Sequence, residues 1–218
     1  MSLIARRPRP IPRDEGKLRD ARLFVIATED TYAPKQYFGF FGHPRIHVEV
    51  LGTSIGEGPD PGSVVNRLIK FAEQYQIEGD DQLWAFLDTD HWIRGNHKAG
   101  LIHAIRDARH RGYKVAMSRP CFDLWLLLHH EEVTPGTIFA SCGNVGARIR
   151  TLRGEFNKTK LKREHYPLSQ VEAAIVRATA LDQGVSEEAA DFWPTRTATR
   201  VYLLMNELKT AGLLPSDA

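Results

Sequence analysis

The stretch QLWAFLDTD, residues 82–90, is the most informative part of the sequence about its fold. Its apolar run is typical of a buried strand, and that strand ends in the carboxylates Asp88 and Asp90. Alternation along an extended chain points residues 88 and 90 the same way, so two negative charges face each other across one short gap. The stretch therefore predicts a buried strand with a positively charged partner at its end.

Other strand-like runs lie on both sides of this stretch, and segments of helical length separate them. The predicted strands cover residues 23–28, 45–52, 82–88 and 113–118. The predicted helices cover residues 34–41, 64–76 with Ser63 as N-cap, and 98–111. This alternation indicates a Rossmann-like α/β fold, in which parallel strands are joined by crossover helices.

The character of the chain changes after the fourth strand. Residues 121–132 are too densely apolar for a surface helix, so we expect them to pack against the sheet. Later segments are helical in pattern: 145–153, 168–184 and 195–212. The expected organisation is therefore a basic flexible leader, an α/β core and a helical C-terminal extension packed on the core, over residues 1–21, 22–143 and 144–218.

Composition narrows the class of protein. The 218 residues are 42% hydrophobic and 26% charged, as in a soluble globular protein, and no apolar run approaches the roughly 20 residues of a membrane helix. The opening residues lack the apolar core of a signal peptide, so we expect a cytoplasmic protein without membrane contact. Two cysteines, Cys121 and Cys142, match no trusted ligand spacing and are expected to be reduced.

The net charge of +2 does not indicate a nucleic-acid binder, although basic residues gather in the first twenty positions. This basic leader is either a solvated disordered segment, which we favour, or a mobile arm that contacts phosphates.

Acidic residues close two of the predicted strands. Glu29 follows the first strand, and Asp88 and Asp90 follow the third. Ligands of an open parallel sheet bind outside the carboxyl ends of its strands, so we expect these acids to converge there. Such carboxylates must be protonated, paired or metal-bound, and Mg²⁺ selects hard oxygen ligands. Alternatively, the D-x-D is ordinary turn chemistry in which Asp90 caps the next segment.

Trp92 could stack on a base or pack at an edge.

Several motifs resemble a known family. An acid after the first strand and a later D-x-D resemble the Toprim fold of topoisomerases, primases and overcoming-lysogenization-defect nucleases. SRPCFDLWLLLHH (118–130) resembles the S-N-P-x-F-E-x-W-L-L-L-H-F signature of RloB-like proteins, a Toprim-related, prokaryotic, defence-associated group. EDTYAPKQYF (29–38) and TRVYLLMNEL (199–208) resemble two further motifs of that group, so the resemblance spans about residues 22–210. The chain departs from the family pattern at Asp30, Arg119 and Asp123.

The resemblance implies a metal-dependent nuclease that hydrolyses phosphodiesters of RNA, including tRNA, or of DNA, as an effector of antiviral defence. Glu29 would be the general base or a metal ligand. Asp88 and Asp90 would hold the principal Mg²⁺ or Mn²⁺, which neutralises charge on the phosphate. Asp123 would add a further carboxylate near this metal.

Other residues have two open interpretations each. Lys158, with Lys160 close behind, either stabilises charge on the reacting phosphate or belongs to a solvated loop. Arg119 could clamp a phosphate or pair with Asp123. His129 could bind substrate, or it could be a helix-end histidine bonded to a backbone carbonyl.

Two other functions compete with the nuclease. The modest net charge suits a non-catalytic interaction module that docks on a separate ATPase, a partner that members of this group often accompany. The same metal site would also serve nucleotidyl transfer or phosphatase action on a small molecule. A homo-oligomer is compatible with each of these functions.

Overall fold

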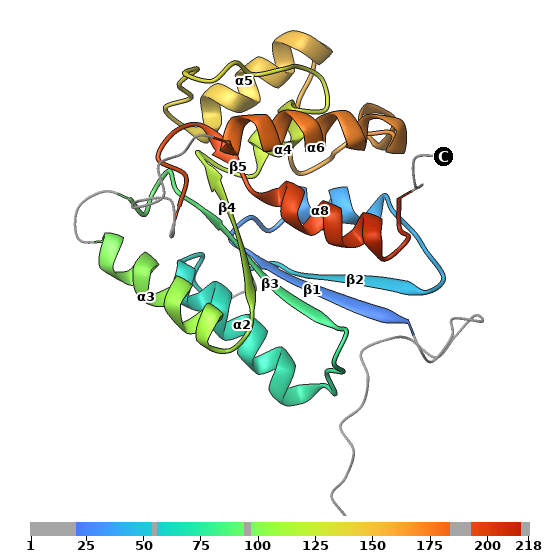
Figure 1. Ribbon diagram of the computed structural model, residues 1–218. Coiled ribbons are helices and arrows are strands. Elements are labelled where there is room, and N and C mark those ends of the chain that lie inside the picture. Colours follow the sequence, from blue (N-terminus) through green and yellow to red (C-terminus); the bar gives the residue numbers. More distant parts are fainter. Residues whose placement is uncertain (1–20, 54–55, 94–96, 184–192, 215–218) are drawn as a thin grey trace, which may run out of the picture.

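The computed structural model describes residues 21–53, 56–93, 97–183 and 193–214, so the predicted leader lies almost wholly outside the described residues. The predicted α/β class is confirmed, because a mostly parallel five-stranded sheet lies between layers of helices (Figure 1). The strands are β1 (Arg22–Thr28), β2 (Ile46–Leu51), β3 (Gln82–Asp88), β4 (Lys114–Arg119) and β5 (Ala198–Thr199). The predicted strands β1 to β4 differ from these bounds by at most one residue at either end.

The order of the strands places the ends of β1 and β3 side by side. The sheet runs β2-β1-β3-β4-β5, with β1 to β4 parallel and β5 antiparallel to β4. From β1 the chain first moves outward to β2, and it then returns to add β3 on the other side of β1. The carboxyl ends of β1 and β3 therefore form the topological switch point, where open α/β sheets bind ligands.

Helices cover both faces of the sheet (Figure 1). Their bounds are α1 (Ala33–Gly39), α2 (Pro61–Gln74), α3 (His97–His110), α4 (Asp123–Leu127), α5 (Cys142–Arg153), the 3₁₀ turn η1 (Arg163–His165), α6 (Leu168–Asp182) and α8 (Val201–Thr210). Alternate residues of β1 serve the two layers: Leu23 and Val25 pack with α2 and α3, whereas Phe24 and Ile26 pack with the remaining helices. Both faces of the central strands are consequently buried.

The dense apolar segment after β4 packs against the sheet as predicted. Only its Asp123–Leu127 part is α-helical, as α4, and the side chains of this short helix are all buried. Trp125 is fully buried and makes an edge contact with Tyr37 of α1. This packing holds the chain that leaves β4 against the carboxyl edge of the sheet.

Residues 195–212 were expected to be entirely helical, and this prediction was wrong at their start. Ala198–Thr199 instead forms β5, and α8 begins only at Val201. The strand forms because β4 would otherwise end the sheet with unpaired backbone groups. Arg200 donates its backbone N–H to the Met117 carbonyl (2.8 Å), and the hydroxyls of Ser118 and Thr199 lie 2.8 Å apart.

The helix α2 begins earlier than predicted and is capped by a different residue. Asp60, not Ser63, is its N-cap, because the Asp60 carboxylate accepts the Ser63 backbone N–H (3.0 Å). Pro61 occupies the first helical position, which needs no N–H donor.

We expect Asp60→Ala to lower the free energy of unfolding by about 1 kcal/mol, because it leaves an N-terminal N–H of α2 without its acceptor. Ser63→Ala should cost less, since Asp60 still accepts from the backbone of residue 63. Urea denaturation followed by circular dichroism measures both. A larger loss in Ser63→Ala would contradict Asp60 as the cap.

Candidate functional site

Glu29 and Asp88 meet at the switch point between β1 and β3. Asp88 donates its backbone N–H to Oε1 of Glu29 (3.1 Å), and the indole N–H of Trp92 donates to Oε2 (2.6 Å). Both carboxylate oxygens of Glu29 therefore have donors that fix its orientation. Trp92 thus holds the Glu29 carboxylate in place. The two sequence interpretations of Trp92, stacking on a base and packing at an edge, did not anticipate this contact.

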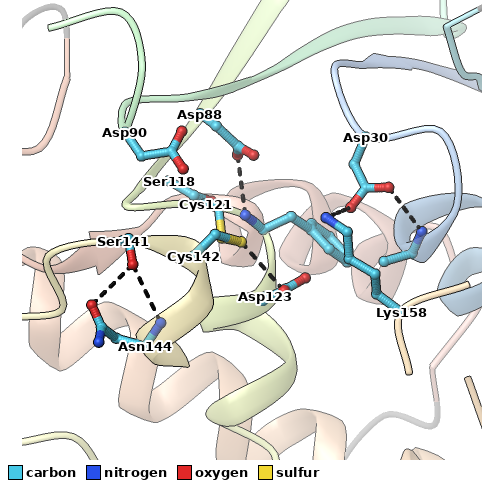
Figure 2. The surroundings of a disulfide bond; sticks show 12 residues. Asp30, Asp88, Asp90, Ser118, Cys121, Asp123, Ser141, Cys142, Asn144 and Lys158 are labelled. Atoms are coloured by element: carbon cyan, nitrogen blue, oxygen red, sulfur yellow. Dashed lines mark hydrogen bonds and ion pairs between the residues drawn. A yellow bond between two sulfur atoms is a disulfide. The ribbon is translucent and has the colours of Figure 1, made fainter. Parts of the chain in front are cut away.

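The loop after β3 is held to the chain that leaves β4. Asp88 Oδ1 accepts the backbone N–H of Phe122 (3.1 Å). Thr89 donates its N–H to Ser118 and Pro120 carbonyls, and Asp90 donates its N–H to the Pro120 carbonyl (3.2 Å). These backbone bonds position the D-x-D at the sheet edge. Figure 2 shows Asp88 and Asp90 on one side of this region and Asp123 below them.

Lys158 enters the same region from a distant part of the chain. Its ammonium group lies 3.0 Å from Oδ2 of Asp30, while Oδ1 of Asp30 accepts backbone N–H groups at the start of α1 (Figure 2). Gln36 fixes the loop by donating to the Lys158 carbonyl (2.9 Å). Both candidate lysines are exposed, but Lys158 reaches an acid of the site, whereas Lys160 lines a separate small pocket with Glu155 and Tyr166.

Burial and mutual repulsion favour protonated carboxyls in this cluster. Burial raises the pKa of Glu29 to about 8, although the bonds from Trp92 and Asp88 oppose this increase. Burial and then the charges of neighbouring acids raise the pKa of Asp88 well above its usual range; these acids are Glu29, Asp90, Asp123 and Asp30. Burial raises the pKa of Asp123 to about 7 against the charge of Lys158. For Lys158, burial disfavours the charge, but the surrounding acids raise its pKa.

The donor atoms of this cluster fit a hard divalent cation. All are carboxylate oxygens, the ligands of Mg²⁺ and Mn²⁺, and Oδ1 of Asp123 is buried without a hydrogen-bond partner. A divalent cation would also offset the repulsion that raises the pKa of Asp88. Glu29, Asp88 and Asp90 do not form a group with all donor atoms within 4.8 Å of one another, so an ion among them would keep water ligands.

The prediction that the cysteines are reduced was wrong for this structure, because Cys121 and Cys142 form a disulfide (Figure 2). They are 21 residues apart, yet the packing of α4 on α5 brings their Cα atoms to 5.6 Å. The spacing of the two cysteines matches no recognisable motif, so the sequence did not predict this contact. Cys142 Sγ also lies 3.3 Å from Oδ2 of Asp123.

The structure does not place His129 where a substrate could bind it, so this prediction is corrected. His129 is buried, with Nδ1 3.0 Å from the Trp125 carbonyl and Nε2 3.1 Å from the Tyr37 hydroxyl. Burial lowers the pKa of His129 to about 3, which keeps the ring neutral. Both ring nitrogens have internal partners, as in the alternative helix-end interpretation.

Arg119 lies beside the D-x-D. It donates to the Pro194 carbonyl (3.3 Å) and, with Asp90 and Arg196, lines a pocket of about 410 Å³. Arg119 and Asp90 thus share the lining of one pocket beside the D-x-D.

Arg67 is a site neighbour that the sequence interpretation missed. It is only 6% exposed and donates to the Thr28 carbonyl (2.7 Å) at the end of β1, where its charge lowers the pKa of Glu29. The available signal was its position on α2, since Arg67 interrupts the apolar face that includes Val64 and Phe71. A charge on such a face indicates a buried partner.

Comparisons with known proteins gave one match. The family model described as RloB-like protein matches residues 24–208, a range that includes every residue of the carboxylate cluster. No curated protein and no solved structure matches the chain. No helix among the described residues is long and apolar enough to span a membrane.

We expect the metal-free protein to lose stability as pH rises from about 4.5 to about 8. The folded state retains a proton on Glu29 up to about pH 8, whereas the unfolded chain releases it near 4.5. The contribution of Glu29 to stability is therefore greatest below the lower value, and its loss is on the order of a few kcal/mol. Urea denaturation in EDTA across this range measures it.

Glu29→Gln should flatten this pH dependence, and Glu73→Gln, at an exposed position of α2, should leave it unchanged. An equally steep profile for Glu29→Gln and wild type would contradict the buried, protonated state of Glu29.

Proposed function

This chain belongs to the RloB-like protein family, and from the carboxylates at its switch point we propose that it is a Mg²⁺- or Mn²⁺-dependent nuclease. The observation that carries the proposal is the environment of Asp88. This side chain is partly buried among the charges of Glu29, Asp90, Asp123 and Asp30, at the edge where α/β sheets bind ligands. Such a cluster is suited to a divalent cation and, through it, to phosphate chemistry.

Asp88, Asp90 and Asp123 would hold the cation, at least one of them through a bound water, because their donor atoms do not all lie within 4.8 Å of one another. Bound there, it would neutralise developing charge on the phosphate and lower the pKa of a coordinated water. Glu29 would receive the proton of the attacking water, because its carboxylate is held in place by Trp92 and its partly buried position raises its pKa above the usual range.

Cationic side chains beside the cluster would bind the substrate. Lys158 adds positive charge on the Asp30 side and would stabilise the reacting phosphate. On the Asp90 side, Arg119 and Arg196 line the pocket of about 410 Å³ and would contact a neighbouring phosphate of the strand. Together these positions would follow the backbone of RNA or DNA across the sheet edge.

The biological setting extends the same proposal. A nuclease of this family would act inside the cell as an effector of antiviral defence, restrained by a partner such as a separate ATPase until triggered. In the alternative, the fold serves only as an interaction module for that partner. The alternative requires no cleavage of nucleic acid under any metal condition.

Asp88→Asn/Asp90→Asn should lower the cleavage of labelled RNA or DNA by at least about a hundredfold, because the metal supplies several kcal/mol of transition-state stabilisation. Cleavage is followed on denaturing gels with Mg²⁺ or Mn²⁺, and titration calorimetry should show metal binding lost in the folded variant. Asp107→Asn, which replaces a surface acid of α3 paired with Arg111, is the matched control.

A folded double variant as active as wild type would overturn the proposal. Intact nucleic acid in wild type with Mn²⁺, even with a co-purifying partner added, would favour the interaction module. Release of phosphate or pyrophosphate from free nucleotides without strand cleavage would instead indicate transfer chemistry on small molecules.

Lys158→Ala should lower kcat by roughly 10- to 100-fold, because it removes positive charge beside the reacting phosphate. Lys160→Ala should change kcat less than twofold, since the Lys160 side chain lines a separate pocket with Glu155 and Tyr166 and not the carboxylate cluster. Steady-state cleavage rates for both variants measure the difference. Equal losses of kcat in the two variants would indicate that the basic loop attracts the substrate in general and does not act at the reacting phosphate.

A further inference from the structure

A second group of potential ligands lies next to the carboxylate cluster and has a different chemistry. The donor atoms of Cys121, Asp123 and Cys142 all lie within 4.8 Å of one another, and among the described residues this is the one such group of three. Two sulfurs and one carboxylate suit a thiophilic cation such as Zn²⁺, and they do not suit Mg²⁺. Figure 2 shows the three side chains facing one another.

Asp123 points independently to a ligand at this position. The side chain is only 3% exposed, and its Oδ1 has no hydrogen-bond partner. Its Oδ2 lies 3.3 Å from Cys142 Sγ, but a disulfide sulfur carries no proton to donate. A buried carboxylate without hydrogen-bond donors is unfavourable. The two Asp123 oxygens therefore indicate a ligand that is missing when the cysteines form a disulfide.

The positions of Cys121 and Cys142 are compatible both with a disulfide and with a reduced pair that binds a metal. Cys142 is partly exposed and is the first residue of α5, where the N-terminal N–H groups favour a negatively charged sulfur. Cys121 is buried beside the start of α4, so a cation reaches it from the Cys142 side. Because Cys142 lies at a helix end, the sulfurs can separate with little change to the helix itself.

We propose that the reduced chain binds one Zn²⁺ through Cys121 Sγ, Cys142 Sγ and the Asp123 carboxylate, with water in the fourth position. A phosphine reductant and one water open the disulfide to two thiols and give the phosphine oxide. Both thiol protons then leave as the metal binds. Disulfide and metal site exclude each other, so the cysteine pair exists either as a cross-link or as a metal ligand set.

The site does not depend on the proposed nuclease activity, although the two share Asp123. Zinc at the cysteines would take Asp123 from the carboxylate cluster. Phe122, whose N–H holds Asp88, lies between Cys121 and Asp123 in the chain. Metal at the cysteine site would therefore compete with the Mg²⁺ site for a ligand and act on the segment that orients Asp88.

The test uses the untagged full chain with Co²⁺ as a spectroscopic probe and Zn²⁺ as competitor, under anaerobic conditions. Phosphine-reduced wild type should bind one equivalent of Co²⁺ with a thiolate-to-cobalt charge-transfer band, and Zn²⁺ should abolish that band. Oxidised wild type should show no band. Cys142→Ser should bind at least about tenfold more weakly, and Asp123→Asn should weaken binding while keeping a thiolate band.

Asp107→Asn is the matched control, because it removes a surface acid of α3 that is paired with Arg111 and should leave the cobalt band unchanged. The absence of a charge-transfer band in reduced wild type would overturn the proposal, as would equal affinities of the oxidised and reduced proteins. Should the cysteine variants misfold by circular dichroism, the oxidised and reduced wild type decide the question. None of these readouts requires nuclease activity.

Discussion

The structure depends on keeping several carboxylates out of water at one edge of the sheet. Desolvation is the largest cause of the raised pKa values of Glu29, Asp88 and Asp123, and the acids also repel one another. The surroundings offset part of this cost with N–H groups, from Asp88 and Trp92 to Glu29 and from Phe122 to Asp88. A fold that maintains such a cluster without a function for it would lose stability for no gain.

The chain between β4 and α4 connects most of this arrangement. Its backbone accepts the N–H groups of the loop after β3, Phe122 donates to Asp88, and Cys121 and Asp123 belong to the second group of ligands. The helix α4, which follows this segment, is buried along its whole length. Any change at the cysteine pair therefore acts on the same short segment that holds the carboxylate cluster in place.

Much of the fold could be predicted from the sequence because the signals are local. Alternating apolar runs gave the four parallel strands, and the acid after β1 and the D-x-D after β3 placed Glu29 and Asp88 at neighbouring strand ends. The motif resemblance indicated the family that the family model matches. The two-residue strand β5 was missed because so short a strand leaves no periodic pattern, and its existence depends on the open edge of β4.

The α/β class, the strands β1 to β4 and the acids that end them follow from the amino-acid sequence alone, because apolar periodicity and strand polarity are local properties of the chain. The contact of Lys158 with Asp30, the contact of Cys121 with Cys142 and the inward orientation of His129 arise only in the folded chain. Each of these contacts joins segments that are distant in sequence. Their approach follows from how helices pack on the sheet, and no spacing of residues along the chain encodes that geometry.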